Sequence, residues 1–255
     1  MLLTPVTDFF GFMGEIGIFG ARAIRRSFVP PFELKETLNQ IYDAGWRSLP
    51  LVIASGFAFG IIIALQTRSE MESFGAGAMI PQAVSTGLFR DIGAIIAALL
   101  VAGRVGAGIG AELAGMRVTE QIDALEAIGV DSFKYLAVTR IAACVIILPI
   151  LTLILNFAGL LGGMLVDTWA LQMSPRAFIE SAFQAMSWSS YVPPTAKTVV
   201  FGFLIGTVAS YLGYNASQGA TGVGRASTRS VVYSLLLVMV SDVILVKLTL
   251  FFFES

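Results

Sequence analysis

Two side chains on which much enzyme chemistry depends are scarce in this chain of 255 residues: histidine is absent, and cysteine occurs once, as Cys144. A single cysteine excludes an internal disulfide. Without histidine the chain lacks a His/Cys metal site and any nucleophile paired with an imidazole base. The phosphate-binding sequence G-x-x-x-x-G-K-[ST] is also missing. The composition therefore excludes most enzyme chemistry, and any ATP-driven work requires a second polypeptide.

Charge is also scarce. Charged residues make up 13% of the chain, and 16 basic against 17 acidic side chains leave a net charge of −1. No basic surface can then neutralise a run of phosphates, so we expect no nucleic-acid partner. Hydrophobic residues make up 56% of the chain, and the mean hydropathy is +0.82. A chain of this length cannot bury so much apolar surface, so the surplus must face lipid.

Five apolar stretches are long enough to cross about 30 Å of hydrocarbon as helices, at about 1.5 Å per residue. They lie near residues 47–67, 88–111, 138–166, 192–213 and 231–253. We predict an all-α polytopic membrane protein with five transmembrane helices. We expect the polar and apolar mixture at 69–86 to lie in the outer interface, and Ser174-Pro175 to begin a short loop helix that ends near Tyr191.

The first 45 residues are predicted to form an interfacial amphipathic helix and a polar connector, followed by a five-span domain at 46–255. Asp8, Glu15 and Arg22 are spaced seven apart and share one face of this helix, and aromatic and aliphatic residues supply the rest. A secretory signal is the alternative. Its basic residues should precede the apolar core, whereas Arg25 and Arg26 follow it.

Basic residues between the spans indicate the orientation of the chain. Ten of them fall before the first span, between the second and third, or between the fourth and fifth, whereas the opposite loops hold only Arg68 and Arg176. Cytoplasmic loops are enriched in Lys and Arg. We therefore predict a cytoplasmic N-terminus and a C-terminus on the outer side. The ten are Arg22, Arg25, Arg26, Lys35, Arg47, Arg117, Lys134, Arg140, Arg225 and Arg229.

A short amphipathic helix is predicted at Thr119–Gly129, in the cytoplasmic loop between the second and third spans. Thr119 is its expected cap and Gly129 its closing residue. Glu120, Asp123 and Glu126 recur every three residues beside an apolar stripe of Ile122, Leu125 and Ile128. From the spacing alone, a surface that docks on a basic partner and a plain solvated linker remain equally open.

Charges within or at the edge of the spans are costly in lipid and are expected to face a partner or a cavity. Arg90 and Asp91 begin the second span on the outer side, and Lys197 lies at a similar depth in the fourth. Together they form a candidate outward-facing pocket for a phosphate, with Gln66 as an uncharged donor. Internal pairing within the helix bundle is the alternative, and we favour it for Asp242 and Lys247, which lie on one helix away from this cluster.

Two blocks of sequence resemble the MlaE (YrbE) permease family of ABC transporters that move phospholipids with MCE-domain proteins. The first is LFRDIGAIIAALLVAGRVGAGIGAELAGMRVTEQIDALEAIGVDSFKYL at 88–136, and the second covers 197–232 with GYNASQGATGVGRASTRSVV. The resemblance extends over most of the chain from Trp46 onward. It implies a permease subunit, not itself an enzyme, that works in outer-membrane lipid homeostasis.

The resemblance also implies the assembly. It predicts a homodimer in the bacterial inner membrane, with a cytoplasmic ABC ATPase, a periplasmic MCE-domain protein and, in some systems, a STAS-domain regulator. The chain itself would hold no cofactor, because ATP and magnesium would be bound by the ATPase. A phospholipid would occupy an outward-facing cavity between the two permease copies.

The site residues implied by the resemblance fall into two groups. The predicted lipid-binding residues are Gln66, Met71, Phe74, Arg90, Asp91, Ile92 and Lys197. The predicted ATPase-coupling residues are Glu120, Gln121, Ile122, Asp123, Leu125, Glu126 and Gly129. One departure from the family lies after the first span, where Arg68, Glu70 and Glu72 replace apolar residues. We hypothesise that Glu70 and Glu72 meet basic residues of the MCE partner.

Two rival functions remain. An ion-coupled secondary transporter or channel for an amphiphilic substrate would also use ionisable groups inside the membrane, although five spans do not divide into two equal repeats. An intramembrane enzyme would need an acid pair or a Ser/Lys pair, and neither occurs at convincing spacing.

Overall fold

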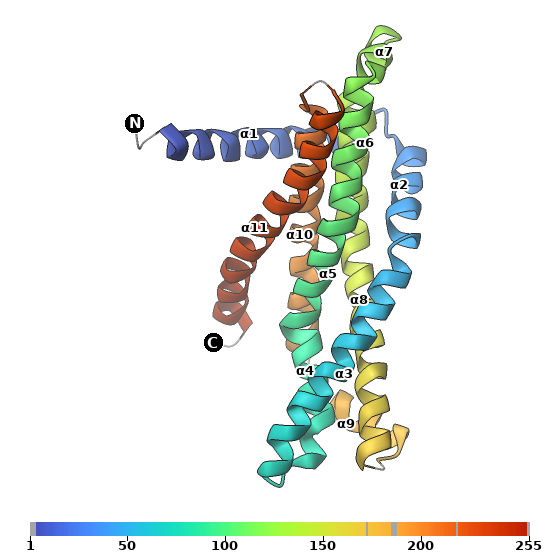
Figure 1. Ribbon diagram of the computed structural model, residues 1–255, viewed down its shortest axis with the longest axis vertical. Coiled ribbons are helices and arrows are strands. Elements are labelled where there is room, and N and C mark those ends of the chain that lie inside the picture. Colours follow the sequence, from blue (N-terminus) through green and yellow to red (C-terminus); the bar gives the residue numbers. More distant parts are fainter. Residues whose placement is uncertain (1–3, 172, 185–187, 218, 254–255) are drawn as a thin grey trace. The chain divides into compact units, whose positions relative to one another are not determined.

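The computed structural model describes residues 4–171, 173–184, 188–217 and 219–253, and all regular secondary structure in these ranges is helical. The predicted all-α class is therefore confirmed. The elements are α1 (Thr4–Ser27), α2 (Leu34–Trp46), α3 (Leu49–Ser73), η1 (Gly77–Met79), α4 (Ile80–Gly87), η2 (Leu88–Ile92), α5 (Gly93–Val101), η3 (Ala102–Gly106), α6 (Ala107–Val118), α7 (Gln121–Ala127), η4 (Phe133–Val138), α8 (Thr139–Leu171), α9 (Pro175–Gln184), α10 (Trp188–Tyr214) and α11 (Ala220–Phe253) (Figure 1).

Among the residues that the structure describes, five helical stretches are long and apolar enough to cross a membrane, as the sequence predicts. They run over Leu49–Ser73, Gly77–Val118, Phe133–Trp169, Tyr191–Tyr214 and Ala220–Thr249. Within the chain, the first and fifth have 22% and 17% of their most apolar windows buried, against 56–61% for the other three. The first and fifth spans therefore leave most of their surface to lipid or to another chain.

The chain divides into two compact units. Unit 1 comprises Met1–Ala44, Val101–Ile147 and Phe201–Val238, and unit 2 comprises Gly45–Leu100, Leu148–Val200 and Met239–Ser255. Helices α2, α5, α8, α10 and α11 each contribute residues to both.

In unit 2, α4 packs against both α3 and α9 (Figure 1). Ala64 of α3 and Ile80, Val84 and Leu88 form a buried cluster here, and Ser85 donates a hydrogen bond of 2.8 Å to the Ala182 carbonyl of α9. The segment predicted at the outer interface is thus the last turns of α3, a turn through Gly75 and helix α4. The location of this segment at the outer interface remains a prediction.

Glycines bring α3 and α8 close together in unit 2. A Cβ atom on Gly56 would lie 2.5 Å from the Leu155 carbonyl oxygen, and one on Gly60 would lie 2.7 Å from the Gly159 Cα. No side chain larger than hydrogen fits at these positions without moving the backbone. Small residues permit this kind of close approach between membrane helices.

In unit 1, α1 packs on η4 and α10 and runs across the direction of α6 (Figure 1). Phe19 and Ala23 of α1 form a buried cluster with Ala137, Val138 and Ile141, and the Tyr211 hydroxyl donates a hydrogen bond to Glu15. A long N-terminal helix is therefore present. Its place at the membrane surface and the predicted division at residue 45 remain predictions.

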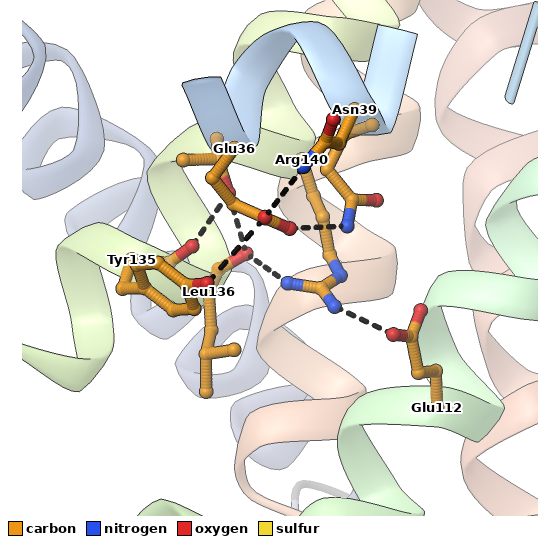
Figure 2. A network of polar contacts seen from close by, with 8 residues as sticks. Glu36, Asn39, Glu112, Tyr135, Leu136 and Arg140 are labelled. Carbon is orange, nitrogen blue, oxygen red and sulfur yellow. Dashed lines mark hydrogen bonds and ion pairs between the residues drawn. The ribbon is translucent and has the colours of Figure 1, made fainter. Parts of the chain in front are cut away.

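The predicted connector after α1 is itself largely helical, as α2. Figure 2 shows the polar contacts between α2 and the neighbouring helices of unit 1. Glu36 accepts hydrogen bonds from Gln40 (2.8 Å) and from the Tyr135 hydroxyl (3.4 Å). Beside it, the buried Arg140 donates to the Leu136 carbonyl (2.9 Å) and to Glu112 of α6 (2.8 Å). An arginine this deeply buried requires such partners.

The loop helix that we predicted on the outer side departs from the prediction at its C-terminal end. Its start is correct, because the Ser174 hydroxyl accepts a hydrogen bond of 3.3 Å from the Ala177 amide. However, α9 ends at Gln184, and Tyr191 belongs to α10. Pro193 and Pro194 lie inside α10 instead of ending a loop helix. They are the sixth and seventh residues of α10, where each lacks the amide hydrogen for a helical hydrogen bond, and the helix continues past them to Tyr214.

Candidate functional site

Three charged side chains from three spans meet in unit 2. The ammonium group of Lys197 on α10 is paired with Asp91 on η2 and lies 2.8 Å from Asp242 on α11. Its side chain is 4% exposed, against 40% for Asp91 and 11% for Asp242. A buried lysine is stable only with such carboxylate partners. The cluster therefore joins the second, fourth and fifth spans and carries one excess negative charge.

Internal pairing within the bundle, which we favoured for Asp242, is confirmed, because Asp242 pairs with Lys197. Its expected place away from Asp91 and Lys197 is wrong. Lys247 is exposed. The spacing of five residues along α11 gives no indication of this, because the partner of Asp242 lies on another helix, and helix rotation decides which residues meet.

The turn that carries Asp91 is a π-helix, η2, in which Arg90 and Ile92 are exposed. Single π turns within α-helices occur often at functional sites. Here the turn ties Asp91 to Lys197 while its neighbours in sequence present one charged and one apolar side chain to the outside. This turn has no signature in the sequence.

The other predicted lipid-binding residues lie on or just after the last turns of α3. Gln66 is exposed, Phe74 is 83% exposed, and Met71 is partly buried against the cluster of Ile80 and Val84. Among the described residues, no hydrogen bond or ion pair connects these three to Asp91 or Lys197. The structure therefore brings together Asp91 and Lys197 from the predicted set, and the role of the set in lipid binding remains a prediction.

The polar residues that depart from the family pattern also lie on α3. Arg68 donates to Glu72 at 2.6 Å, one turn along the same helix, whereas Glu70 is exposed. The ion pair with Arg68 partly neutralises the charge of Glu72. Of the two glutamates, Glu70 is therefore the stronger candidate for the hypothesised contact with a basic partner.

The predicted amphipathic loop segment of unit 1 forms helix α7. Gly129 has φ +82°, and its amide donates to the Glu126 carbonyl at 3.0 Å. This left-handed residue ends the helix as predicted, and glycine adopts that conformation without strain. At the other end the prediction is wrong. The Thr119 hydroxyl bonds to the Gly115 carbonyl of α6, and Glu120, with φ 59°, occupies the N-cap position.

The acidic side chains of α7 do not all point to a partner. Asp123 forms an ion pair of 2.7 Å with Arg117 of α6, and Glu126 accepts hydrogen bonds from Ser132 and Tyr214. Ile122 is fully buried and anchors the helix. Two of the predicted coupling acids therefore hold α7 in place.

The outward surface of α7 includes other residues besides Asp123 and Glu126, which are themselves exposed. Glu120, Gln121 and Ala124 are exposed, and Ile128, just after the helix, is 75% exposed. Leu125 is half-buried. An apolar side chain this exposed, beside acidic and amide groups, suits a contact with another protein. Sequence periodicity placed Ile128 and Ile122 on one stripe, but they have opposite environments.

The described part of the chain has no group of three or more Cys, Asp or Glu side chains that could hold a metal ion. Cys144 is buried in α8. The charged cluster around Lys197 and the exposed surface of α7 are the two candidate functional sites among the predicted residues.

The described residues, all helical where regular, with five helices long and apolar enough to cross a membrane, define a multi-pass membrane protein. The model of the family "Permease MlaE" matches residues 37–248. The chain therefore belongs to the MlaE permease family, and it is an ABC transporter permease.

Curated relatives cover nearly the whole chain. A "Probable ABC transporter permease protein" of Rickettsia felis is 38% identical over 236 residues, which is 92% of this chain and 91% of the relative. A similarly named protein of Synechocystis is 33% identical over 208 residues, 82% of this chain and 79% of the relative. The "Intermembrane phospholipid transport system permease protein MlaE" of Haemophilus influenzae is 31% identical over 243 residues, 94% and 92% of the two chains.

Proposed function

We propose that this permease moves phospholipids between the bacterial inner membrane and a periplasmic MCE-domain protein, driven by a separate cytoplasmic ATPase. The observation that carries the proposal is the η2 turn, which exposes Arg90 and Ile92 while Asp91 is tied to Lys197. An arginine beside an aliphatic side chain suits an amphiphile with a phosphate and acyl chains. The phospholipid named in the Haemophilus relative supports the same substrate class.

The lipid would lie in an outward-facing cavity between two copies of the chain. The low burial of the first and fifth spans supports a second copy, because those spans leave apolar surface uncovered. In this cavity the Lys197 cluster would hold three spans in register, and Arg90 would meet the headgroup. Gln66, Met71 and Phe74 would line the rim at the end of α3.

Coupling to the ATPase would pass through α7. ATP with magnesium would bind to the ATPase, and its closure would move α7 and the spans attached to it. Nucleotide can shift the transporter between states only if lipid contacts differ between them. The anchoring of α7 through Ile122, Asp123 and Glu126 supports such a rigid connection. A STAS-domain regulator would bind on the ATPase side.

The orientation follows from the basic residues. Ten of the 16 basic residues fall before the first predicted span, between the second and third, or between the fourth and fifth, which favours the cytoplasmic side for the N-terminal helix and for the loop that carries α7. The C-terminus would then lie on the periplasmic side. The ends of α3, α4 and α9 would meet the MCE partner.

Reversing the charge of Arg90 tests the lipid site. In Arg90→Glu we expect the phospholipid that co-purifies with the permease and its ATPase to fall about tenfold or more, because a cation on the phosphate becomes an anion. Phosphorus content per protein measures the effect. Arg176→Glu is the control, since Arg176 is 89% exposed on α9 and pairs with Glu180. Equal phosphorus content in wild type and Arg90→Glu would remove Arg90 from the headgroup site.

A further inference from the structure

A basic site lies in unit 1, beside the last two turns of α1. A cavity of about 450 Å³ is lined there by Arg22, Arg25, Arg26, Val29 and Phe133. We call it the arginine pocket. Its three guanidinium groups come from one face of α1, at positions i, i+3 and i+4. None of them belongs to the Lys197 cluster or to α7.

The arginine pocket has uncompensated positive charge. Arg26 pairs with Asp131 at 2.9 Å, which neutralises one cation. Arg22 lies over the Phe133 ring at 5.6 Å, and such an aromatic contact leaves the charge in place. Among the residues that the structure describes, neither Arg22 nor Arg25 has a carboxylate partner. Two guanidinium groups are therefore available for an anion, and their planar forks suit the oxygens of a phosphate.

The opposite side of the same turns of α1 is apolar. A groove of about 260 Å³ is lined there by Ile24 of α1, Ile141 and Val145 of α8, and Phe203 of α10, with Ala23, Ser27, Ala142 and Ile146. Helices α8 and α10 are membrane spans, so we place this groove at the depth of the lipid acyl chains. The boundary between acyl chains and headgroups then runs along α1, and the arginine pocket lies on its polar side.

We propose that the arginine pocket binds the phosphate of an anionic phospholipid from the membrane leaflet in which α1 lies. This lipid is a resident ligand that fixes α1 against η4, and it differs from the lipid that the permease moves. The charge selects anionic over zwitterionic lipids, because two uncompensated cations attract a net negative headgroup. A cavity of this size accommodates a phosphodiester headgroup. The apolar groove on the opposite side of α1 sets these turns at a membrane boundary, which favours a lipid over a free anion as the occupant.

Lipid binding to the full-length permease in detergent tests the proposal. The probes are dioleoylphosphatidylglycerol and dioleoylphosphatidylcholine, and native mass spectrometry counts the lipids bound. Wild type is expected to bind phosphatidylglycerol more tightly. Arg22→Gln with Arg25→Gln should lower that affinity about 10- to 30-fold and leave phosphatidylcholine binding unchanged. Equal affinity of wild type for both lipids, or an unchanged affinity in the double variant, would overturn the proposal.

Matched controls separate this site from other basic surfaces. Arg225→Gln with Arg229→Gln removes the same two charges from exposed positions of α11 and should keep wild-type binding. Arg90→Glu should lower lipid binding at the transport site alone, so phosphatidylglycerol should stay bound and should still depend on Arg22 and Arg25; loss of all bound phosphatidylglycerol in Arg90→Glu would assign the lipid to the transport site. Glycerol 1-phosphate should not compete with the lipid, and full competition would make the pocket a site for free anions. If the double variant does not fold, Arg25→Gln alone gives the same test, with a smaller loss.

Discussion

Replacing Lys197 by methionine is expected to lower the stability of the folded permease by about 3–5 kcal/mol, the usual effect of removing one partner of a buried ion pair. The change leaves Asp91 and Asp242 facing each other without the cation that now lies between them. The side chain of Asp242 is 11% exposed and cannot recover this energy from water. Thermal unfolding in detergent, followed by tryptophan fluorescence, measures the loss.

Two further variants show whether the charge cluster is the cause. Asp91→Asn and Asp242→Asn in the Lys197→Met background remove the stranded charges, so most of the lost stability should return. Lys247→Met is the control on α11, where an exposed lysine should matter by about 0.5 kcal/mol or less. If Lys197→Met unfolds at the wild-type temperature, or if the triple variant is no more stable than the single one, the cluster does not hold the spans together.

Introducing a charge at Ile128 is expected to abolish binding of the ATPase. Ile128 is the most exposed large apolar side chain at α7, so Ile128→Asp should remove an apolar contact and bury a carboxylate at the centre of the interface, at the cost of its hydration. Central apolar contacts in interfaces are commonly worth about 2 kcal/mol or more, which means a loss of affinity of about 30-fold. The amount of ATPase that co-purifies with tagged permease, and the ATP hydrolysis of that complex, measure the effect.

The control variants for α7 follow from burial. Ile128→Val should keep the ATPase, because it preserves an apolar contact. Ile122→Ala should instead destabilise the permease itself, by about 2–5 kcal/mol, since Ile122 is fully buried. Undiminished ATPase binding by a folded Ile128→Asp variant would mean that coupling passes through another surface.

The lengths of the apolar stretches predicted the spans, because a helix in lipid must present apolar residues over its whole length. The end of α7 was also predictable, since Gly129 provides a left-handed residue directly after a periodic segment. The start of α7 was not. Thr119 could cap α7 or bond back to α6, and the structure shows the bond to Gly115, one turn earlier. Local sequence does not decide between two such hydrogen bonds.

The charged sites show the same limit at longer range. Asp91 and Lys197 could be grouped from their depth in the membrane, whereas Asp242 could not. Its contact with Lys197 depends on the rotation of α11 about its axis. The arginine pocket combines α1 with Phe133, more than 100 residues later in the chain, and was not foreseen. Contacts between distant helices depend on how the helices pack, and the periodicity of a single sequence does not predict that packing.

The main rival function uses the same cluster differently. A buried lysine between two carboxylates inside the membrane would also suit an ion-coupled secondary transporter. The two accounts differ in the source of energy. An ion-coupled carrier works as a single kind of chain, whereas an ABC permease depends on a partner that hydrolyses ATP.

The decisive measurement is transfer of labelled phospholipid from proteoliposomes to a soluble acceptor, with the permease reconstituted alone and together with its ATPase. We predict transfer only when the ATPase and hydrolysable ATP are both present, with none supported by a non-hydrolysable analogue or by an ion gradient. Transfer by the permease alone, driven by an ion gradient, would contradict the account.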